Sequence, residues 1–520
     1  MADYFGLTAL GISCALGNDA QTVWKRAAAG DVSGMRMLDG VLPGGQSAPF
    51  GMCEAAEGAW PSRVAALMAA AAAGFSDEIE AAKAHYGAGR IGVVVGTSNS
   101  TMEEFTRNPD VIDMSTPALF LRSRLGLEGP ALAVSTACSS GVKVFASARK
   151  LIASGVCDAV VTGGADSFAR VVMRGFDSLE VISRSLTRPL GKGRDGINLG
   201  EGAALFLMEK NRGEIAVLGI GESSDAHHLT APEPEGRGAE ASMRAALADA
   251  KLEAKDIVYV NLHGTGTVQN DKMESNAVWR VFGDGPLCSS SKPLIGHTLG
   301  AAGALETALA YLMLKNGGVT LAHPLAGERD GELPPLRLAA AGDAYRPGPV
   351  ISNSFAFGGS NASIVLGAPP VADVLPHDPP MVLLTSFDPA SFSEDRLSAF
   401  VEIDGDSPFC DGALGGVSSV FALEYMAQTM AALVGLKRRR MRLAPRIGFV
   451  LGSRSIDVGV DRFVRGERYR VDAEMVFTDG SFASFDVRIV AGDGTVAAKG
   501  RLNAFEPEDE DIVKIKEGMS

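Results

Sequence analysis

The chain has 520 residues, with 48 Lys and Arg against 62 Asp and Glu, so its formal net charge is −14. This balance argues against a nucleic-acid-binding surface, because binding to phosphates needs concentrated positive charge. Six cysteines without a CxxC pair argue against a disulfide framework and against a zinc site.

The N-terminal residues carry no export signal, since residues 1–5 have neither a cationic region nor a cleavage site. The longest Ala-rich run, around residues 65–75, is far shorter than the ~20 apolar residues that a membrane helix needs. We therefore expect a cytoplasmic protein without a membrane span.

From the N-terminus to about Leu366, strand-like apolar runs alternate with Ala-rich helical stretches. The runs at 91–95, 159–162 and 258–260 are typical of buried strands. This alternation predicts an α/β fold with a mostly parallel sheet that is covered on both faces.

Cys138 follows a strand-like run and a turn of small residues, and it precedes a helix-like run over residues 142–153. The N-terminus of a helix favours the thiolate, which is the nucleophilic form of cysteine. The alternative is that a cysteine flanked by Ala and Ser is only a small buried hydrophobe. This segment alone does not decide between the two interpretations.

Two loops bounded by glycine each carry a histidine. His263 follows a strand in the segment 261–267, and His297 precedes a small-residue helix in the segment 292–303. The chain has only seven histidines, and loops just beyond apolar strands are where sites in α/β sheets lie. A further Gly-rich turn, at 353–361, could direct backbone N–H groups at an oxyanion.

These segments, with the Arg-Asp-Gly…Gly-Glu-Gly block at 194–202, resemble the signature blocks of the β-ketoacyl-acyl-carrier-protein synthases, in order, across about residues 4–367. The resemblance implies a thiolase fold of two similar α/β halves in five layers, about 1–210 and 211–367, that is usually dimeric. It also implies decarboxylative condensation of an acyl thioester with malonyl-acyl carrier protein. No cofactor beyond the carrier's phosphopantetheine and no metal are expected.

The resemblance also gives the matching residues their roles. Cys138 would take the acyl chain, while His263 and His297 would bind the malonyl carbonyl and stabilise the enolate. Lys292 would tune the charge of the histidines. The backbone N–H groups of Cys138 and Phe357 would form the oxyanion hole, with the Phe357 ring as a gate. Other matches are the substrate-binding positions Thr265, Thr267 and Gly358 and the structural carboxylates Glu306 and Asp271.

Two alternatives share the implied fold. Chain-length-factor subunits serve as non-catalytic scaffolds and have lost the nucleophile, whereas this chain keeps Cys138. A biosynthetic thiolase is the other alternative; degradative thiolases keep a Cys and one His but have a second cysteine where this chain has His297. A cysteine together with two histidines therefore favours a decarboxylating synthase over both.

Beyond the synthase region, a Pro-rich stretch at 368–380 predicts a linker, because its composition disfavours helix and sheet interior. One helix candidate, at 420–437, is followed by strand candidates near 469–477, 482–490 and 495–504. This content predicts a small α+β domain over residues 381–507. The acidic tail at 508–520 is predicted to be disordered.

This second domain resembles the hotdog-fold 3-hydroxyacyl-carrier dehydratases, and most closely the dehydratase-like proteins of bacterial aryl polyene pathways. The segments that carry the resemblance are 375–384, 423–428, 448–452 and 501–505. In that family a His and a Glu or Asp together remove water. Glu424 matches the carboxylate, but the segment 407–412 has no His at the family's position. No His follows His377, which matches a non-catalytic position.

The resemblance thus leaves Glu424 without an imidazole. The domain is expected to be either non-catalytic or half of a site that a second hotdog subunit completes with its own His. The alternative for Glu424 is a structural helix carboxylate, and Gln428, one turn later, fits a supporting role. Other expected partners are acyl carrier protein and a related synthase or chain-length factor, in a homodimer or heterodimer. The expected pathway is aryl polyene or fatty-acid-like biosynthesis.

Overall fold

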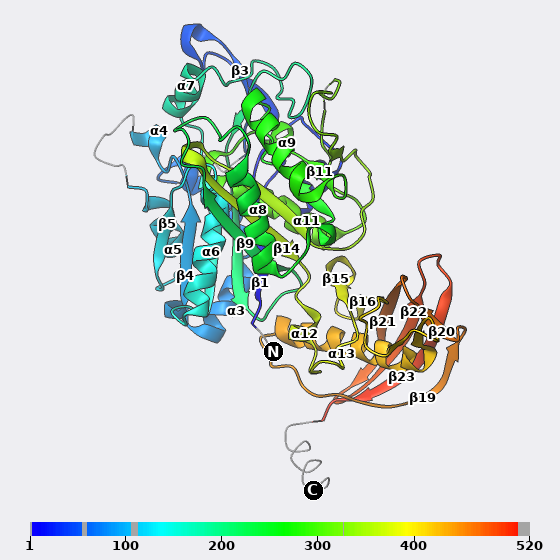
Figure 1. Cartoon of the computed structure of the whole chain (residues 1–520). Helices are drawn as coiled ribbons and strands as arrows, with labels where there is room; N and C mark the ends of the chain where they lie inside the picture. The colour runs from blue at the N-terminus through cyan, green and yellow to red at the C-terminus, as the bar shows by residue number, and fades with distance from the viewer. Residues whose placement is uncertain (1–2, 55–59, 106–112, 326, 508–520) are drawn as a thin grey trace. The chain divides into compact units, whose positions relative to one another are not determined.

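The computed structural model describes residues 3–54, 60–105, 113–325 and 327–507, which form two compact units (Figure 1). The larger unit comprises Leu7–Lys210 and Val217–Gly367. The smaller unit contains the C-terminal part from Ala368 and the short segment Asn211–Ala216. The tail at 508–520, predicted to be disordered, lies outside the described residues.

An eleven-stranded sheet runs through the larger unit in the order β12-β11-β10-β13-β14-β9-β1-β8-β6-β4-β5. In chain order its strands are β1 (Phe5–Ser13), β4 (Ile91–Gly96), β5 (Ala131–Val134), β6 (Ala159–Asp166), β8 (Gly202–Lys210), β9 (Ala216–Ser224), β10 (Tyr259–Asn261), β11 (Leu287–Ser289), β12 (Arg337–Leu338), β13 (Val350–Phe355) and β14 (Ser360–Gly367). The three runs predicted as buried strands lie in β4, β6 and β10, all buried.

The sheet contains the same strand order twice. The first half reads β5-β4-β6-β8-β1 and the second reads β11-β10-β13-β14-β9. In each half the first three strands are parallel and the fourth is antiparallel to the third. The first half ends with β8 at Lys210 and the second begins with β9 at Ala216. The repeated strand order and the repeated strand pairing confirm the predicted thiolase fold.

Helices cover the two halves and fill the space between them, which gives five layers (Figure 1). The outer helices of the first half are α2 (Arg63–Ala73), α3 (Ser76–Tyr86) and α5 (Thr116–Arg124), and those of the second are α8 (Arg237–Ala250) and α9 (Val268–Phe282). The central layer consists of α6 (Ser140–Ala153) and α11 (Ala302–Asn316). Residues 302–314 of α11 are all buried, as expected for a helix that is apolar all round.

Smaller elements complete the larger unit. They are the helices α1 (Ala20–Ala28), α4 (Met102–Phe105), α7 (Arg170–Ser178) and α10 (Lys292–Ile295) and a three-stranded sheet of β2 (Met35–Leu38), β3 (Ala48–Gly51) and β7 (Leu199–Gly200).

The two central helices meet closely at Gly141. A Cβ atom at this position would lie 2.5 Å from the Ala304 nitrogen and 2.9 Å from the Gly300 carbonyl oxygen. Because both atoms belong to the backbone, only glycine allows this approach. The contact holds the start of α6, next to Cys138, against the loop that follows His297.

The smaller unit is a six-stranded antiparallel sheet around one long helix, the hotdog arrangement that the sequence predicts. Its order is β15-β16-β21-β22-β23-β19. The strands are β15 (Ser386–Asp388), β16 (Arg396–Glu402), β19 (Phe449–Val458), β21 (Arg468–Asp479), β22 (Phe482–Val490) and β23 (Val496–Phe505), with a minor sheet of β17 (Cys410–Asp411), β18 (Gly416–Ser418) and β20 (Arg462–Val464). The helix, α13 (Ala422–Arg440), packs on β16, β21 and β22.

Two further features concern α13. By length and composition alone the helical stretch Ser419–Arg440 could cross a membrane, but more than half of its most apolar 18-residue window is buried inside the folded chain. The predicted linker at 368–380 contains a short helix, α12 (Val371–Val374), that packs on α13. Arg439 of α13 also donates a hydrogen bond to the Asp373 carbonyl oxygen, at 2.7 Å. Through these contacts the Pro-rich segment packs as part of the smaller unit.

Candidate active site

The three candidate catalytic side chains all follow the carboxyl ends of parallel strands. Cys138 lies beyond β5, His263 beyond β10 and His297 beyond β11. Because β5 and β11 occupy the same position in the two halves, the duplication places Cys138 and His297 at equivalent points. The carboxyl ends of parallel strands meet at one edge of a sheet, which is where sites of α/β folds form.

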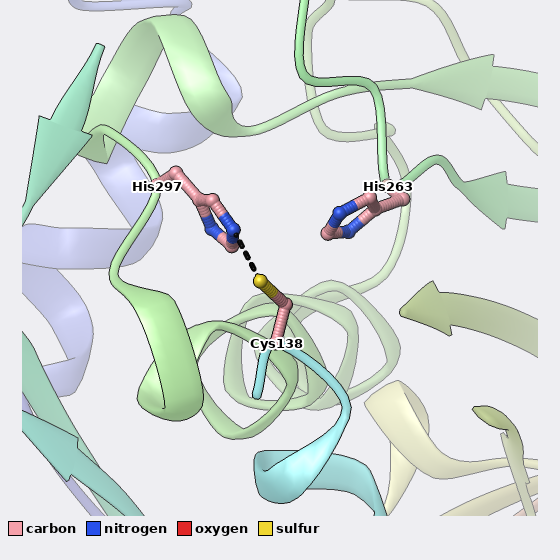
Figure 2. Close-up of side chains that lie close together, drawn as sticks. All are labelled: Cys138, His263 and His297. Carbon is pink, nitrogen blue, oxygen red and sulfur yellow. Dashed lines mark hydrogen bonds between the residues drawn. The ribbon is translucent and has the colours of Figure 1, made fainter. Parts of the chain in front are cut away.

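The structure brings these three side chains together (Figure 2). His297 Nε2 lies 2.9 Å from Cys138 Sγ, and the two imidazole rings are 5.3 Å apart between centroids. The sulfur and one nitrogen of each ring all lie within 4.8 Å of one another. The residues are only 7%, 2% and 1% exposed for Cys138, His263 and His297, so their chemistry takes place away from bulk water.

Burial decides the protonation states. It raises the pKa of the Cys138 thiol from its ordinary 9.0 to about 12, although Lys292 and a hydrogen bond from the Phe357 backbone act in the opposite direction. Burial and the nearby Lys292 cation lower the pKa of both histidines well below 6.5. The site therefore holds a thiol beside two neutral imidazoles, and His297 Nε2 is the atom placed to accept the thiol proton.

Lys292 and Glu306 form a buried ion pair behind the histidines. Lys292 Nζ also donates to the His263 carbonyl oxygen at 2.7 Å. Burial raises the pKa of Glu306, and Lys292 opposes that change. Lys292 thus fixes the His263 backbone and supplies the positive charge that disfavours protonation of both imidazoles.

Two carboxylates of α9 hold the His263 loop. Asp271 accepts hydrogen bonds from the backbone N–H groups of Leu190, at 2.8 Å, and Gly266, at 3.1 Å. Glu274, which the sequence analysis missed, accepts from the N–H groups of His263 and Gly264, both at 2.7 Å. Burial raises the pKa of Glu274 to about 7 and that of Asp271 to about 6. Asp271 and Glu274 lie three residues apart on one helix, and this spacing is the sequence signal from which the role of Glu274 could have been predicted.

Asp166, at the end of β6, holds the His297 loop and was also missed. Its carboxylate accepts from the backbone N–H of Gly300 at 2.6 Å and from that of Ser98 at 3.0 Å. It also accepts from the Thr97 hydroxyl at 2.5 Å. Asp166 is fully buried and thereby links the loop after β4 to the loop that carries His297.

A cavity of about 490 Å³ opens onto the thiol and both imidazoles, and Thr265, Thr267 and Phe357 also line it. The two threonine hydroxyl oxygens lie 2.9 Å apart, and the Phe357 ring stacks on Phe176 at 5.5 Å between centroids. Gly358 lies outside this lining, and its N–H donates to the Leu229 carbonyl at 2.7 Å. Glu424 belongs to the smaller unit.

Cys138, His263 and His297 are also the one group of His, Cys and acidic side chains, among the described residues, that is spaced to hold a metal ion. A thiolate and two imidazoles suit zinc. Zinc bound there would occupy the sulfur and both nitrogens, and would therefore block the thiol.

A buried thiol with two neutral imidazoles, at one edge of a duplicated α/β sheet, defines a thiolase-fold condensing enzyme. Family models agree: "Beta-ketoacyl synthase, N-terminal domain" matches residues 61–213 and "Beta-ketoacyl synthase, C-terminal domain" matches residues 215–324. The chain belongs to the β-ketoacyl synthase family. A third model, "ApeP dehydratase", matches residues 369–515.

Three curated relatives match the synthase part of the chain. Nodulation protein E of Rhizobium sp. (strain N33) is 33% identical over 395 residues, which are 68% of this chain and 97% of the relative. Nodulation protein E of Rhizobium meliloti is 38% identical over 263 residues, 48% of this chain, and the match spans only 64% of that relative. The 3-oxoacyl-[acyl-carrier-protein] synthase 2 of Staphylococcus aureus (strain COL) is 32% identical over 54% of this chain and 75% of the relative.

Solved structures match the larger unit's fold. The ketosynthase ApeO from Xenorhabdus doucetiae, in complex with its chain length factor ApeC, aligns with a TM-score of 0.67 and 38% identity over 71% of this chain and 98% of that chain. The ishigamide ketosynthase/chain length factor aligns with a TM-score of 0.64 and 27% identity, over 71% of this chain and all of that chain.

Proposed function

We propose that the chain condenses an acyl thioester with malonyl-acyl carrier protein, losing CO₂ and forming a 3-oxoacyl-carrier product. The single observation that carries this proposal is the 2.9 Å contact between Cys138 Sγ and His297 Nε2, with His263 beside both. A thioester can form on this sulfur, and two neutral imidazoles can stabilise an enolate without a metal.

The first step is acyl transfer. The Cys138 sulfur attacks the thioester carbonyl of the acyl carrier while its proton passes to His297 Nε2. The tetrahedral oxyanion accepts hydrogen bonds from the backbone N–H groups of Cys138 and Phe357. When the intermediate collapses, the carrier's phosphopantetheine sulfur leaves and takes the proton from His297, so the imidazole becomes neutral again.

The second step is decarboxylation and carbon–carbon bond formation. His263 and His297 donate hydrogen bonds to the thioester carbonyl of the malonyl group, which becomes an enolate when CO₂ leaves. The enolate carbon attacks the carbonyl of the acyl-Cys138, and the Cys138 thiolate departs and takes up one proton from the solvent, the proton that decarboxylation consumes. Each hydrogen bond to the enolate contributes about 3 kcal/mol to lowering the barrier. Lys292 serves this step by disfavouring protonation of the imidazoles.

The similarity to ApeO, solved with a chain length factor, and the ApeP dehydratase match support a place in aryl polyene or related fatty-acid-like biosynthesis. The location that we propose for these reactions is the cytoplasm. The same similarity supports pairing with a chain length factor or a second synthase chain. A scaffold role would need none of the three side chains of Figure 2.

For the smaller unit, the matching proposal is dehydration of a 3-hydroxyacyl chain with Glu424 as the carboxylate. In its composite form, a separate hotdog subunit supplies the imidazole across an interface between the two hotdog domains.

Reconstitution tests the condensation. The purified chain, alone and with a chain-length-factor partner, is incubated with acyl-carrier and ¹³C-labelled malonyl-carrier, and the carrier-bound products are analysed by mass spectrometry. We expect a 3-oxoacyl chain longer by the labelled two-carbon unit, with one CO₂ released per product. A product that forms from acetyl-thioester without CO₂ release would support a thiolase instead. Absence of any product with both partners present would support a scaffold.

A further inference from the structure

His323 is a buried histidine that takes no part in the proposed reaction. It lies in the segment that follows α11, is only 7% exposed, and is absent from the lining of the active-site cavity. Its Nδ1 accepts a hydrogen bond from the backbone N–H of Ser290 at 3.0 Å, and its Nε2 donates to the Pro189 carbonyl oxygen at 3.1 Å. The imidazole therefore joins two segments that are far apart in the sequence.

Only one form of the His323 imidazole makes both hydrogen bonds. A backbone N–H can only donate and a carbonyl oxygen can only accept, so Nδ1 must be without a proton and Nε2 must carry one. Burial lowers the pKa of His323 to about 4, although the hydrogen bond to Pro189 acts in the opposite direction. The imidazole is therefore neutral near pH 7, and its two partners select the form with the proton on Nε2.

Ser290 connects this imidazole to the loop of His263. It is fully buried, and its Oγ donates to the carbonyl oxygen of Gly264, the residue after His263, at 2.7 Å. A Cβ atom at Gly264 would lie 2.6 Å from the Ser290 Cβ, so the two residues are in direct contact. The Ser290 Oγ also accepts from the Lys292 N–H at 3.3 Å. A displacement of Ser290 would therefore be passed directly to the loop of His263.

Pro189 connects the imidazole to the same loop by a second route. The next residue, Leu190, donates its N–H to Asp271 at 2.8 Å, and Asp271 accepts from the Gly266 N–H at 3.1 Å. The two routes form a closed hydrogen-bond ring that begins and ends in the His263 loop, with the members Gly264, Ser290, His323, Pro189, Leu190, Asp271 and Gly266 in order. His323 closes this ring.

The position of the His263 side chain depends on its backbone. His263 Nδ1 is buried and has no hydrogen-bond partner among the described residues, so no bond at that atom orients the imidazole. The backbone of His297 is held outside the ring, because its N–H donates to the Asn198 carbonyl at 2.8 Å and its carbonyl accepts from the Gly200 N–H at 3.0 Å. A change at His323 should therefore affect His263 more than His297.

We propose that His323 is a positioning residue for His263: its imidazole holds Ser290 and Pro189 so that the hydrogen-bond ring keeps the His263 loop in place for decarboxylation. The proposal rests on the proposed function, because it takes stabilisation of the malonyl enolate as the task of His263. His323 acts through the backbone and touches no reacting atom. Its effect can still be large, since a misplacement of ~1 Å can cost ~10²-fold in rate.

The test compares two substitutions of His323 in the full-length chain. His323→Leu removes both hydrogen bonds, whereas His323→Asn keeps an acceptor for the Ser290 N–H, because the Asn Oδ1 is as many bonds from the backbone as the Nδ1 that it replaces. We expect His323→Leu to lower CO₂ release from malonyl-carrier by ~10–10²-fold. Acylation of Cys138, followed by intact mass, should stay close to the parent rate. His323→Asn should recover most of the lost CO₂ release.

Ser290→Ala tests the route from His323 to the loop and removes only one hydroxyl group. It should reproduce the defect of His323→Leu, and the double variant should be no worse than the more impaired single variant, because both changes act along one route. Losses that multiply in the double variant would overturn the proposal. Tyr259→Phe is the matched control, since it removes a buried hydrogen bond to Ser289 outside the ring. It should lower the melting temperature and leave CO₂ release near the parent rate.

NMR of the ¹³C-labelled histidines gives a readout that does not depend on activity. The His263 signal, identified by its absence in His263→Gln, should move in His323→Leu and return in His323→Asn. An unmoved signal would overturn the proposal, as would CO₂ release by His323→Leu at the parent rate or no recovery in His323→Asn. A parent chain that releases no CO₂, with the signal moving as expected, would count against the proposed function and support the positioning role.

Discussion

At the level of single residues, two effects act in opposite directions on the pKa of Cys138: burial favours the thiol, and the helix N-terminus favours the thiolate. The rise in the Cys138 pKa from 9.0 to about 12 corresponds to roughly 4 kcal/mol. A helix N-terminus stabilises an anion by about 0.3–1 kcal/mol at exposed positions. Burial therefore dominates, and the thiolate that the position of Cys138 predicts does not form ahead of the reaction. The proton must leave during attack, which gives the nearby His297 a second task.

This reasoning predicts different defects for the two histidines. His297→Ala should slow acylation of Cys138 by ~10²–10⁴-fold, because the thiol loses its proton acceptor. His263→Ala should acylate near the parent rate and should lose malonyl decarboxylation by ~10²–10³-fold. Acyl-enzyme formation is followed by intact mass, and CO₂ release is measured in parallel. Acylation of His297→Ala at the parent rate would remove that residue from the first step.

The buried histidines also predict a dependence of stability on pH. Their pKa values are well below 6.5 in the folded chain and close to 6.5 in the unfolded chain. At a pH between the folded and the unfolded pKa, the unfolded chain therefore binds more protons than the folded chain. Stability contributed by the neutral imidazoles is thus complete above about pH 6.5 and decreases as the pH falls. His263→Gln should reduce the slope of unfolding free energy against pH by up to ~1.4 kcal/mol per pH unit. Equal slopes in urea titrations of parent and variant would contradict this assignment.

At the level of secondary-structure elements, two glycines in helices provide a matched comparison. Gly141→Ala places a methyl group against backbone atoms of Ala304 and Gly300, and should destabilise the fold by ~1–3 kcal/mol and reduce condensation. Gly175→Ala, on the exposed face of α7 where nothing lies within 4 Å, should stabilise it by ~0.5–1 kcal/mol. Denaturant unfolding and the condensation assay measure both effects. A neutral Gly141→Ala would show that α6 and α11 tolerate a wider separation.

The elements of both units could be predicted from apolar runs, since those runs coincide with β4, β6, β10 and β21–β23. The positions of Cys138, His263 and His297 could be predicted too, because each lies in a short motif next to a strand. Asp166 could not, because its partners come from segments that only folding brings together. Glu274 left a signal in the sequence, its spacing of three residues from Asp271, that the sequence analysis did not use. The duplication could be expected from the family resemblance alone, since the two halves share strand order and no short sequence repeat.

At the level of the whole molecule, one chain carries a synthase unit and a hotdog unit whose proposed chemistries are not consecutive. The proposed condensation gives a 3-oxo group, whereas the proposed dehydration requires a 3-hydroxy group, so a reduction has to take place between the two. The growing chain therefore has to leave on its carrier and return. Each unit needs access for the carrier's phosphopantetheine, and neither reaction requires the product to pass directly from one unit to the other.

The most direct measurement concerns the covalent intermediate on Cys138. The chain is incubated with acyl-carrier, its intact mass is recorded, and the modified cysteine is located by peptide mapping before and after addition of malonyl-carrier. We predict one acyl group on Cys138 that disappears into 3-oxoacyl product, the same behaviour in Cys410→Ala, and neither acyl group nor product in Cys138→Ala. Product formation by Cys138→Ala near the parent rate, or an acyl group on another residue that turns over, would contradict the assignment.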